Sequence, residues 1–255
     1  MLSIVTQLRN EEKRIKEWIK YHNLIGIENF IIFDDNSEDN SVEILRDLSK
    51  SYNIKIFNSL RVGKYIETKN PNIYSSVDLH ERIKYSYNQG LNLLKNNFPL
   101  ENHWCFFIEV DEFLDWKTNI SDYLKSISPN INRLHIPSYD FDDNLDLDKN
   151  ILPQSKYRWS EETKNNSIFF ARSKSCYRIT PTSNPILCIH HLDYGRCIKT
   201  FGGEIVDING KKPESLEARC IIQNDENIVK INHYRIPANI NKFDIFDDSL
   251  TKYNL

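Results

Sequence analysis

The stretch FFIEVDEFL, residues 106–114, places three acids directly after a run of large apolar side chains. The apolar run is typical of a buried strand, whereas Glu109, Asp111 and Glu112 follow it within four residues. Carboxylates this close repel one another and lose hydration on burial, unless a cation lies between them. Two acids separated by one residue, such as Glu109 and Asp111, also occur in solvated turns. The alternative to a cation site is therefore an ordinary turn.

A second stretch, FIIFDDNSEDNS at residues 30–41, has the same layout of an apolar strand followed by acids. Asn, Asp and Ser favour turns and helix caps, which explains Asn40 or Ser41. That explanation does not require Asp34 and Asp35 side by side at the end of the strand. We therefore expect both acidic stretches to lie in one cleft if their strands are neighbours in the sheet.

The first half of the chain alternates between strand and helix patterns. The expected strands span 2–8, 29–33, 53–57 and 103–110. One expected helix follows Asn10 as its cap, a second follows Asn40, and a third spans 77–94. Alternation of this kind predicts an α/β fold with a mostly parallel central sheet flanked by helices. Ligands of such sheets bind outside the carboxyl ends of the strands, where both acidic stretches lie.

The remainder of the sequence is less regular. Residues 58–76 are polar and are expected to form a loop that closes over a ligand. From about residue 117 onward the pattern is irregular, with strands expected at 133–137, 167–179, 186–195 and 228–236. No repeat or linker is evident, so we expect a single domain.

Composition excludes several classes of protein. The chain of 255 residues has a net charge of −3, which gives no overall attraction to nucleic acid. No apolar run approaches the length of a membrane-spanning helix, and the N-terminus lacks the features of a signal peptide. Five cysteines without close metal-type spacing indicate reduced thiols, and we therefore expect a cytoplasmic protein.

Three segments together resemble a known family. TQLRNEEKRIKEWIKYHNLIGIENFIIFDDNSEDNS, WCFFIEVDEFL and INHYRI occur in this order between residues 1 and 236. The set resembles nucleotide-sugar glycosyltransferases of the GT-A fold, in detail family 92 and the related bacterial family 2-like group. The resemblance implies one GT-A domain over 1–255, with a nucleotide-sugar-binding half (1–116) and an acceptor-side half (117–255).

The resemblance also implies a donor site. Asp35 matches the residue that contacts the base of the nucleotide, and Thr6 and Gln7 would line the same pocket. The residues that the resemblance places at the donor are Thr6, Gln7, Asn10, Asp34, Asp35, Arg82, Lys84, Glu112 and Arg235. For the two helix cations, Arg82 and Lys84, solvated positions on an exposed helix face are the alternative.

The same comparison implies a metal site for Mn²⁺ or Mg²⁺. Glu109 and Asp111 match the D-x-D metal motif, with Glu in place of the first Asp. His233 matches a late histidine that completes the metal or diphosphate site, and its alternative is a packed strand histidine. The candidates for the base that activates the acceptor hydroxyl are Asp143, Asp142 and Asp193.

The expected reaction is inverting transfer of a hexose from a UDP-sugar, with UDP-galactose or a close relative favoured. The expected acceptor is a glycan or lipid-linked oligosaccharide in surface polysaccharide or lipooligosaccharide synthesis, reached from the inner membrane face by peripheral association. One alternative is a nucleotidyltransferase or other phosphoryl-transfer enzyme, although TQLRNEE lacks the glycines of a phosphate loop. Another is a non-catalytic carbohydrate-binding protein.

Overall fold

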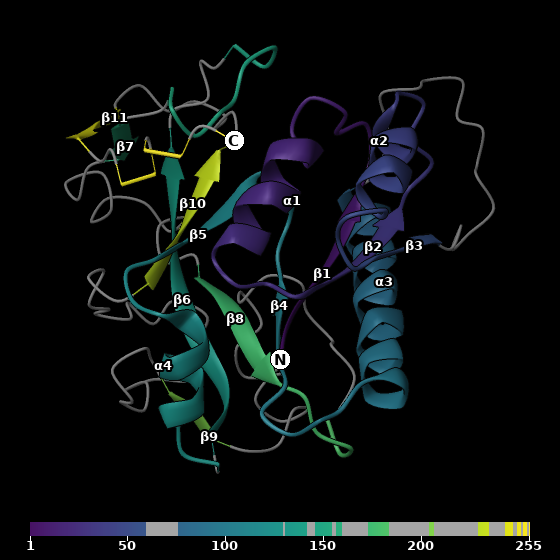
Figure 1. Cartoon of the computed structure of the whole chain (residues 1–255), viewed down its shortest axis with the longest axis vertical. Coiled ribbons are helices and arrows are strands. Elements are labelled where there is room, and N and C mark those ends of the chain that lie inside the picture. The colour runs from purple at the N-terminus through teal and green to yellow at the C-terminus, as the bar shows by residue number, and fades with distance from the viewer. Residues whose placement is uncertain are drawn as a thin grey trace.

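A computed structural model describes residues 1–59, 76–129, 131–141, 146–154, 157–159, 173–183, 204–206, 229–234, 243–246, 249–250, 252–253 and 255. The helices in these ranges are α1 (Ile15–Leu24), α2 (Ser41–Leu48), α3 (Ser76–Asn97) and α4 (Ile120–Ser126). The strands are β1 (Leu2–Leu8), β2 (Asn29–Asp34), β3 (Ile54–Asn58), β4 (Trp104–Phe107), β5 (Glu112–Trp116), β6 (Ile131–Phe141), β7 (Tyr157–Trp159), β8 (Ser173–Arg178), β9 (Glu204–Val206), β10 (Val229–Tyr234) and β11 (Phe243–Phe246). Figure 1 labels them along the chain.

The predicted parallel arrangement is confirmed for the first four strands. They lie in the order β4-β1-β2-β3, and each neighbouring pair is parallel. The register places Leu8 opposite Asp34, and Asp34 opposite Asn58, so β1, β2 and β3 end level with one another. Beyond β4 the sheet continues through antiparallel β8 and β6, and β10 joins β6 to β5.

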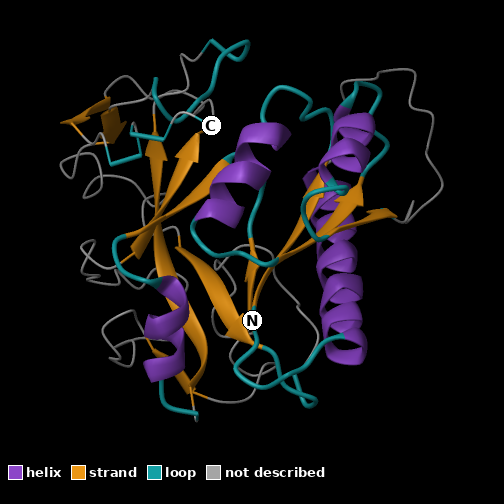
Figure 2. Ribbon diagram, viewed as in Figure 1, coloured by secondary structure: helices purple, strands orange, loops and turns teal. Residues whose placement is uncertain are grey.

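Helices cover both faces of the parallel strands (Figure 2). Side chains alternate between the faces along β1, where Ile4 joins the apolar cluster under α1 and α2 while Val5 joins the cluster under α3. Because both faces are buried, β1, β2 and β4 contain runs of consecutive apolar residues, such as residues 30–33 of β2, instead of a strict alternation with polar residues. The near-continuous apolar runs in the sequence follow from this sandwich.

Two local predictions are wrong. Asn10 does not cap α1, because residues 11–14 form a turn in which the Glu11 carbonyl accepts from Arg14 and Ile15, so the helix begins at Ile15. The expected strand over 103–110 ends at Phe107. The chain then turns through residues 108–111, so Glu109 and Asp111 lie between the two strands and Glu112 is the first residue of β5.

Helix α1 holds β5 in place through buried polar contacts. Trp18 Nε1 donates to the Glu112 carbonyl at 2.9 Å, and the Leu114 amide donates to His22 Nε2 at 3.3 Å. Burial lowers the pKa of His22 to about 3, so the ring is neutral and can accept this bond. Since the β5 backbone is fixed at Glu112, the position of the acidic turn is fixed as well.

Other expectations concern cysteines and membranes. Cys105 and Cys176 are buried free thiols, as expected. Among the described residues, no helix combines the length and apolar character needed to cross a bilayer. The strand expected at 186–195 and most of the loop expected at 58–76 lie outside the described residues.

Gly90 on α3 allows the helix to approach β1 closely. A Cβ at this position would overlap the methyl groups of Val5, which is fully buried. We predict that Gly90→Ala destabilises the protein by about 1–3 kcal/mol through overpacking, although alanine is the better helix former. Urea unfolding would measure the change. Asn92→Ala, on an exposed position of the same helix, is the control; equal stability of the two variants would contradict the close packing.

Candidate active site

The loops that follow β1 and β2 bind each other. Asn10 Oδ1 accepts from the Glu38 amide at 2.8 Å, and Glu12 Oε2 accepts from the Asn40 amide at 3.0 Å. In return, the Glu12 amide donates to Asp39 Oδ2 at 3.0 Å. These two motif-bearing loops therefore form one unit at the carboxyl edge of the sheet, and the side chain of Asn10 contributes to it.

Asp34, the last residue of β2, and Asp35, which follows it, have different partners. Asp34 accepts from the Ser37 amide at 3.1 Å and so closes a turn. Asp35 forms a two-oxygen contact with Arg82 of α3, with Nε at 3.1 Å from both carboxylate oxygens and Nη2 at 3.0 Å from Oδ2. The side chains of Asp35 and Arg82 are 10% and 12% exposed, so this pair is largely shielded from solvent.

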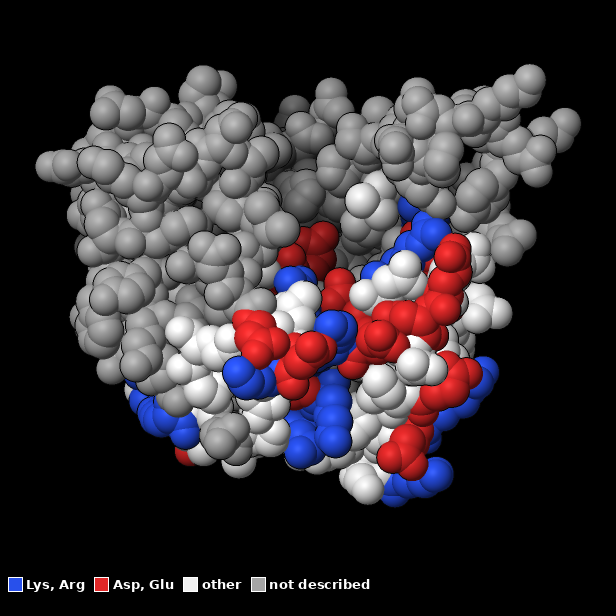
Figure 3. Space-filling view, turned by 90° about the horizontal axis from the view of Figure 1, so that it is seen from above, with Lys and Arg blue, Asp and Glu red and all other residues white. Residues whose placement is uncertain are grey.

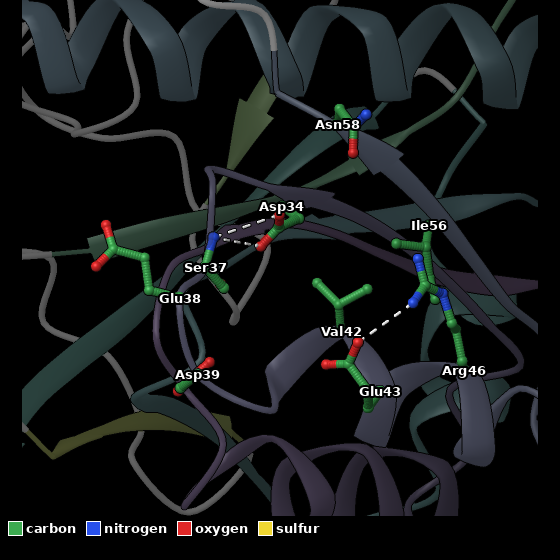
Figure 4. A pocket seen from close by; sticks show the side chains of 9 residues that line it. All are labelled: Asp34, Ser37, Glu38, Asp39, Val42, Glu43, Arg46, Ile56 and Asn58. Carbon is green, nitrogen blue, oxygen red and sulfur yellow. Dashed lines mark hydrogen bonds and ion pairs between the residues drawn. The ribbon is translucent and has the colours of Figure 1, made fainter.

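A hollow of about 430 Å³ lies beside Asp34, between the ends of β2 and β3 and the start of α2 (Figure 4). Its lining residues are Asp34, Ser37, Glu38, Asp39, Val42, Glu43, Arg46, Ile56 and Asn58. Arg46 is the one cation in this lining, and it is paired with Glu43 at 3.4 Å. An acidic hollow of this kind repels a diphosphate, so we do not assign it to the phosphates of a donor.

The two residues of β1 that are expected in the nucleotide pocket are both buried. Thr6 is fully buried, and its hydroxyl donates to the Gln7 carbonyl. Gln7 Oε1 accepts from Ser86 Oγ of α3 at 2.7 Å and from Ser59 Oγ after β3 at 3.2 Å. Gln7 thus links three elements around the same edge of the sheet.

The acidic turn after β4 meets His233 of β10. Carboxylate oxygens of Glu109 and Asp111 and a ring nitrogen of His233 all lie within 4.8 Å of one another. His233 Nε2 is 3.1 Å from Asp111 Oδ2, and the Tyr234 amide donates to the Asp111 carbonyl at 2.8 Å. Burial alone would raise the pKa of Asp111, but His233 holds this pKa below its ordinary value. The structure thus brings together the three residues expected to bind the metal.

Glu112 lies beneath this group and is fully buried. Its Oε2 accepts from the Glu109 amide at 2.9 Å and is 3.1 Å from Lys174 Nζ of β8. Burial raises the pKa of Glu112, and the charges of Glu109 and Glu112 raise the pKa of Lys174 above its usual range despite burial. Lys174 was not predicted, because a single lysine within an expected strand carries no distinctive spacing.

The donor atoms of this group fit a divalent cation. Carboxylates are the ligands of hard ions such as Mg²⁺ and Mn²⁺, whereas imidazole suits softer transition metals. Two carboxylates and one imidazole therefore fit Mn²⁺ better than Mg²⁺, which prefers an all-oxygen octahedron. The residues that would hold the ion are Glu109, Asp111 and His233.

Figure 3 shows the described surface from above relative to Figure 1, with acidic side chains across its middle and Lys and Arg among them. On the described part of this face the basic residues form no continuous track. Lys84 is half-buried on α3. Asp142, Asp143, Asp193 and Arg235 lie outside the described residues.

The fold and the site together define a class of protein. Parallel strands in the order β4-β1-β2-β3, with acids at their carboxyl edge, form the GT-A type of α/β fold. The model of glycosyltransferase family 92 matches residues 3–238. The chain belongs to this family.

Plant members of the family are similar to part of the chain. A family 92 protein of Oryza sativa subsp. japonica is 26% identical over 145 residues, which are 55% of this chain and 21% of that protein. A family 92 protein of Ricinus communis is 30% identical over 146 residues, 55% of this chain and 22% of that protein. The matched segment thus spans about a fifth of the length of these curated relatives.

Solved structures show a weaker likeness. Staphylococcus aureus TarS in complex with UDP is 13% identical with a TM-score of 0.39, over 70% of this chain and 46% of that chain. Glucosyl-3-phosphoglycerate synthase from Mycobacterium tuberculosis, in complex with Mn²⁺, UDP and glucosyl-3-phosphoglycerate, is 15% identical with a TM-score of 0.32, over 55% of this chain and 44% of that chain. With TM-scores this low, no residue of this chain is matched to a site residue of these two enzymes.

Glu11, which follows β1, titrates near neutral pH. Burial raises its pKa to about 7, and the charges of Asp111, Asp39 and Glu109 add to the increase, against Arg14, which lowers it. A glutamate with a raised folded-state pKa keeps its proton to higher pH when folded. Its contribution to stability is therefore complete below about pH 4.5 and is lost as the pH rises to about 7.

We predict that Glu11→Gln removes this loss. With a chelator present, the free energy of unfolding of the variant should rise relative to wild type by about 1–3 kcal/mol between about pH 4.5 and pH 7.5. Urea unfolding at several pH values would measure it. Glu28→Gln, at an exposed position, is the control; the same pH trend in both variants would contradict the shifted pKa of Glu11.

Proposed function

We propose that this chain is a metal-dependent glycosyltransferase that transfers a hexose from a nucleoside-diphosphate sugar to a hydroxyl of a glycan acceptor. The observation that carries the proposal is the convergence of Glu109, Asp111 and His233 at the carboxyl edge of the parallel sheet. Membership of family 92 supports the reaction type. The Asp35–Arg82 pair at the end of β2 supports a nucleotide site beside the metal site.

The divalent ion, when bound, offsets the charge that develops on the departing diphosphate. Glu109, Asp111 and His233 would hold that ion, and Glu112 holds the turn that carries two of them. Arg82 orients the Asp35 carboxylate, which retains lone pairs for an N–H group of the base. Gln7, at the edge of β1, completes the wall of the nucleotide pocket.

A UDP-sugar, UDP-galactose or a close relative, is the favoured donor, and inversion is the favoured stereochemistry, because of the family resemblance. The candidate bases are Asp142, Asp143 and Asp193. The proposed acceptor is a glycan or lipid-linked oligosaccharide in surface polysaccharide or lipooligosaccharide synthesis. We propose a cytoplasmic protein that associates peripherally with the inner membrane face.

The first test is release of UDP from a panel of UDP-sugars, with Mn²⁺ or with EDTA. We predict that one donor is hydrolysed slowly, that EDTA abolishes the reaction, and that Asp111→Asn lowers the rate by at least about 100-fold, since a metal contributes several kcal/mol. Asp47→Asn, an exposed acid on α2, is the control and should keep the wild-type rate.

Two outcomes would contradict this proposal at different points. Turnover that persists in EDTA and in the Asp111→Asn variant would contradict the metal dependence, while the assignment as a glycosyltransferase would stand. If the protein neither turns over nor binds any UDP-, GDP-, CMP- or dTDP-sugar, the transferase assignment is wrong. The alternative of a non-catalytic carbohydrate-binding protein is then favoured.

The adjacent acids of β2 provide a second test. Asp35→Asn removes the charge paired with Arg82, whereas Asp34→Asn retains an oxygen that can accept from the Ser37 amide. We predict that Asp35→Asn weakens UDP binding by about 10-fold to 100-fold, in keeping with the loss of one charge-assisted contact. Asp34→Asn should change it by less than about threefold. Calorimetry would measure both, and equal losses would contradict the assignment of Asp35 to the nucleotide.

A further inference from the structure

Lys174 is a buried cation within the acidic group. Its side chain is 7% exposed, and it projects from β8, which pairs with β4 at the centre of the sheet. The ammonium is 3.1 Å from Glu112 Oε2 and 3.5 Å from Glu109 Oε2. One lysine therefore contacts two carboxylates that belong to the same turn.

The contact with Glu109 is not needed to compensate buried charge. Glu112 is fully buried and requires a cation, which Lys174 supplies. The Glu109 side chain is 28% exposed and could be solvated instead. Its contact with Lys174 therefore fixes the direction of a carboxylate that also faces Asp111 and His233.

The ion-paired side chains of Glu112 and Lys174 hold Glu109 at two points. Glu112 Oε2 accepts its backbone amide, while Lys174 contacts its carboxylate. The ammonium also reduces the net charge of the three carboxylates Glu109, Asp111 and Glu112 from −3 to −2. When His233 is neutral, this charge is balanced by the +2 charge of a divalent ion. Groups that orient a metal ligand in this way commonly change metal affinity by about 10-fold to 100-fold when removed.

We propose that Lys174 is a positioning residue that aims Glu109 at the divalent ion. This inference rests on the metal site of the proposed function. In the described part of the chain Lys174 is paired with Glu109 and Glu112, so its effect would be on the affinity of these residues for the metal, in the absence of any sugar donor. Removal of Lys174 should weaken Mn²⁺ binding even where the fold is intact.

The test separates positioning from charge compensation. Lys174→Met alone leaves the buried Glu112 with only the more distant His233 ring, at 3.8 Å, among its described ion-pair partners, and can unfold the chain. The decisive variant is therefore Lys174→Met combined with Glu112→Gln, which removes both charges. Its reference is Glu112→Gln, whose amide oxygen can still accept from the Glu109 amide. Calorimetric titration with Mn²⁺ alone gives the affinity, and thermal unfolding in EDTA confirms the fold.

A buried lysine away from the site provides the matched control. Lys230 of β10 has a side chain that is 5% exposed and lies 3.6 Å from Asp115, and Asp115 also contacts Lys117 at 2.7 Å. Lys230→Met therefore removes a buried lysine while its partner acid keeps a cation. The Mn²⁺ affinity of this variant should stay within about threefold of wild type.

We expect the Kd for Mn²⁺ of the double variant to exceed that of Glu112→Gln by about 10-fold to 100-fold. Metal-free UDP binding should be unchanged. If wild type binds Mn²⁺ but the double variant and Glu112→Gln agree within about threefold, the positioning role is wrong while the metal site stands. If wild type binds no Mn²⁺, the metal role in the proposed function fails first, and the role of Lys174 fails with it.

Discussion

Negative charge concentrated where the parallel strands end is the constraint around which this site is built. Glu109, Asp111 and Glu112 lie within one turn, and Glu112 is fully buried. Buried carboxylates at such spacing are unfavourable unless cations oppose them. Lys174 opposes part of this charge, and an imidazole from β10 faces the remainder. The arrangement has the form of a site prepared for a divalent cation.

The surrounding elements serve this turn. Helix α1 fixes the β5 backbone at Glu112 through Trp18, and the Tyr234 amide ties β10 to the carbonyl of Asp111. Helix α3 supplies Arg82 to the end of β2 and packs closely on β1 at Gly90. Two loops joined by reciprocal hydrogen bonds complete the same edge. The sheet therefore functions as a platform that brings short segments from distant parts of the sequence to one place.

The sequence predicted the parallel half of the fold because buried parallel strands leave long apolar runs between helical patterns. The rule that ligands bind at the carboxyl ends of strands placed both acidic stretches together. His233 was found through the family resemblance, since pairing between β10 and β5 is a long-range contact with no local signal. Lys174 was missed for the same reason. The roles of Asn10 and Asp34 were harder to interpret, because each binds a backbone amide that its residue type does not specify.

The central claim is that the acids after β4 and the histidine of β10 hold a divalent ion that binds the donor diphosphate. The most direct measurement is anomalous diffraction from crystals grown with Mn²⁺ and UDP. We predict an anomalous peak in contact with Glu109, Asp111 and His233, with the UDP diphosphate on the same ion. A peak elsewhere, for example in the acidic hollow beside Asp34, or ordered UDP without a peak at these residues, would contradict the account.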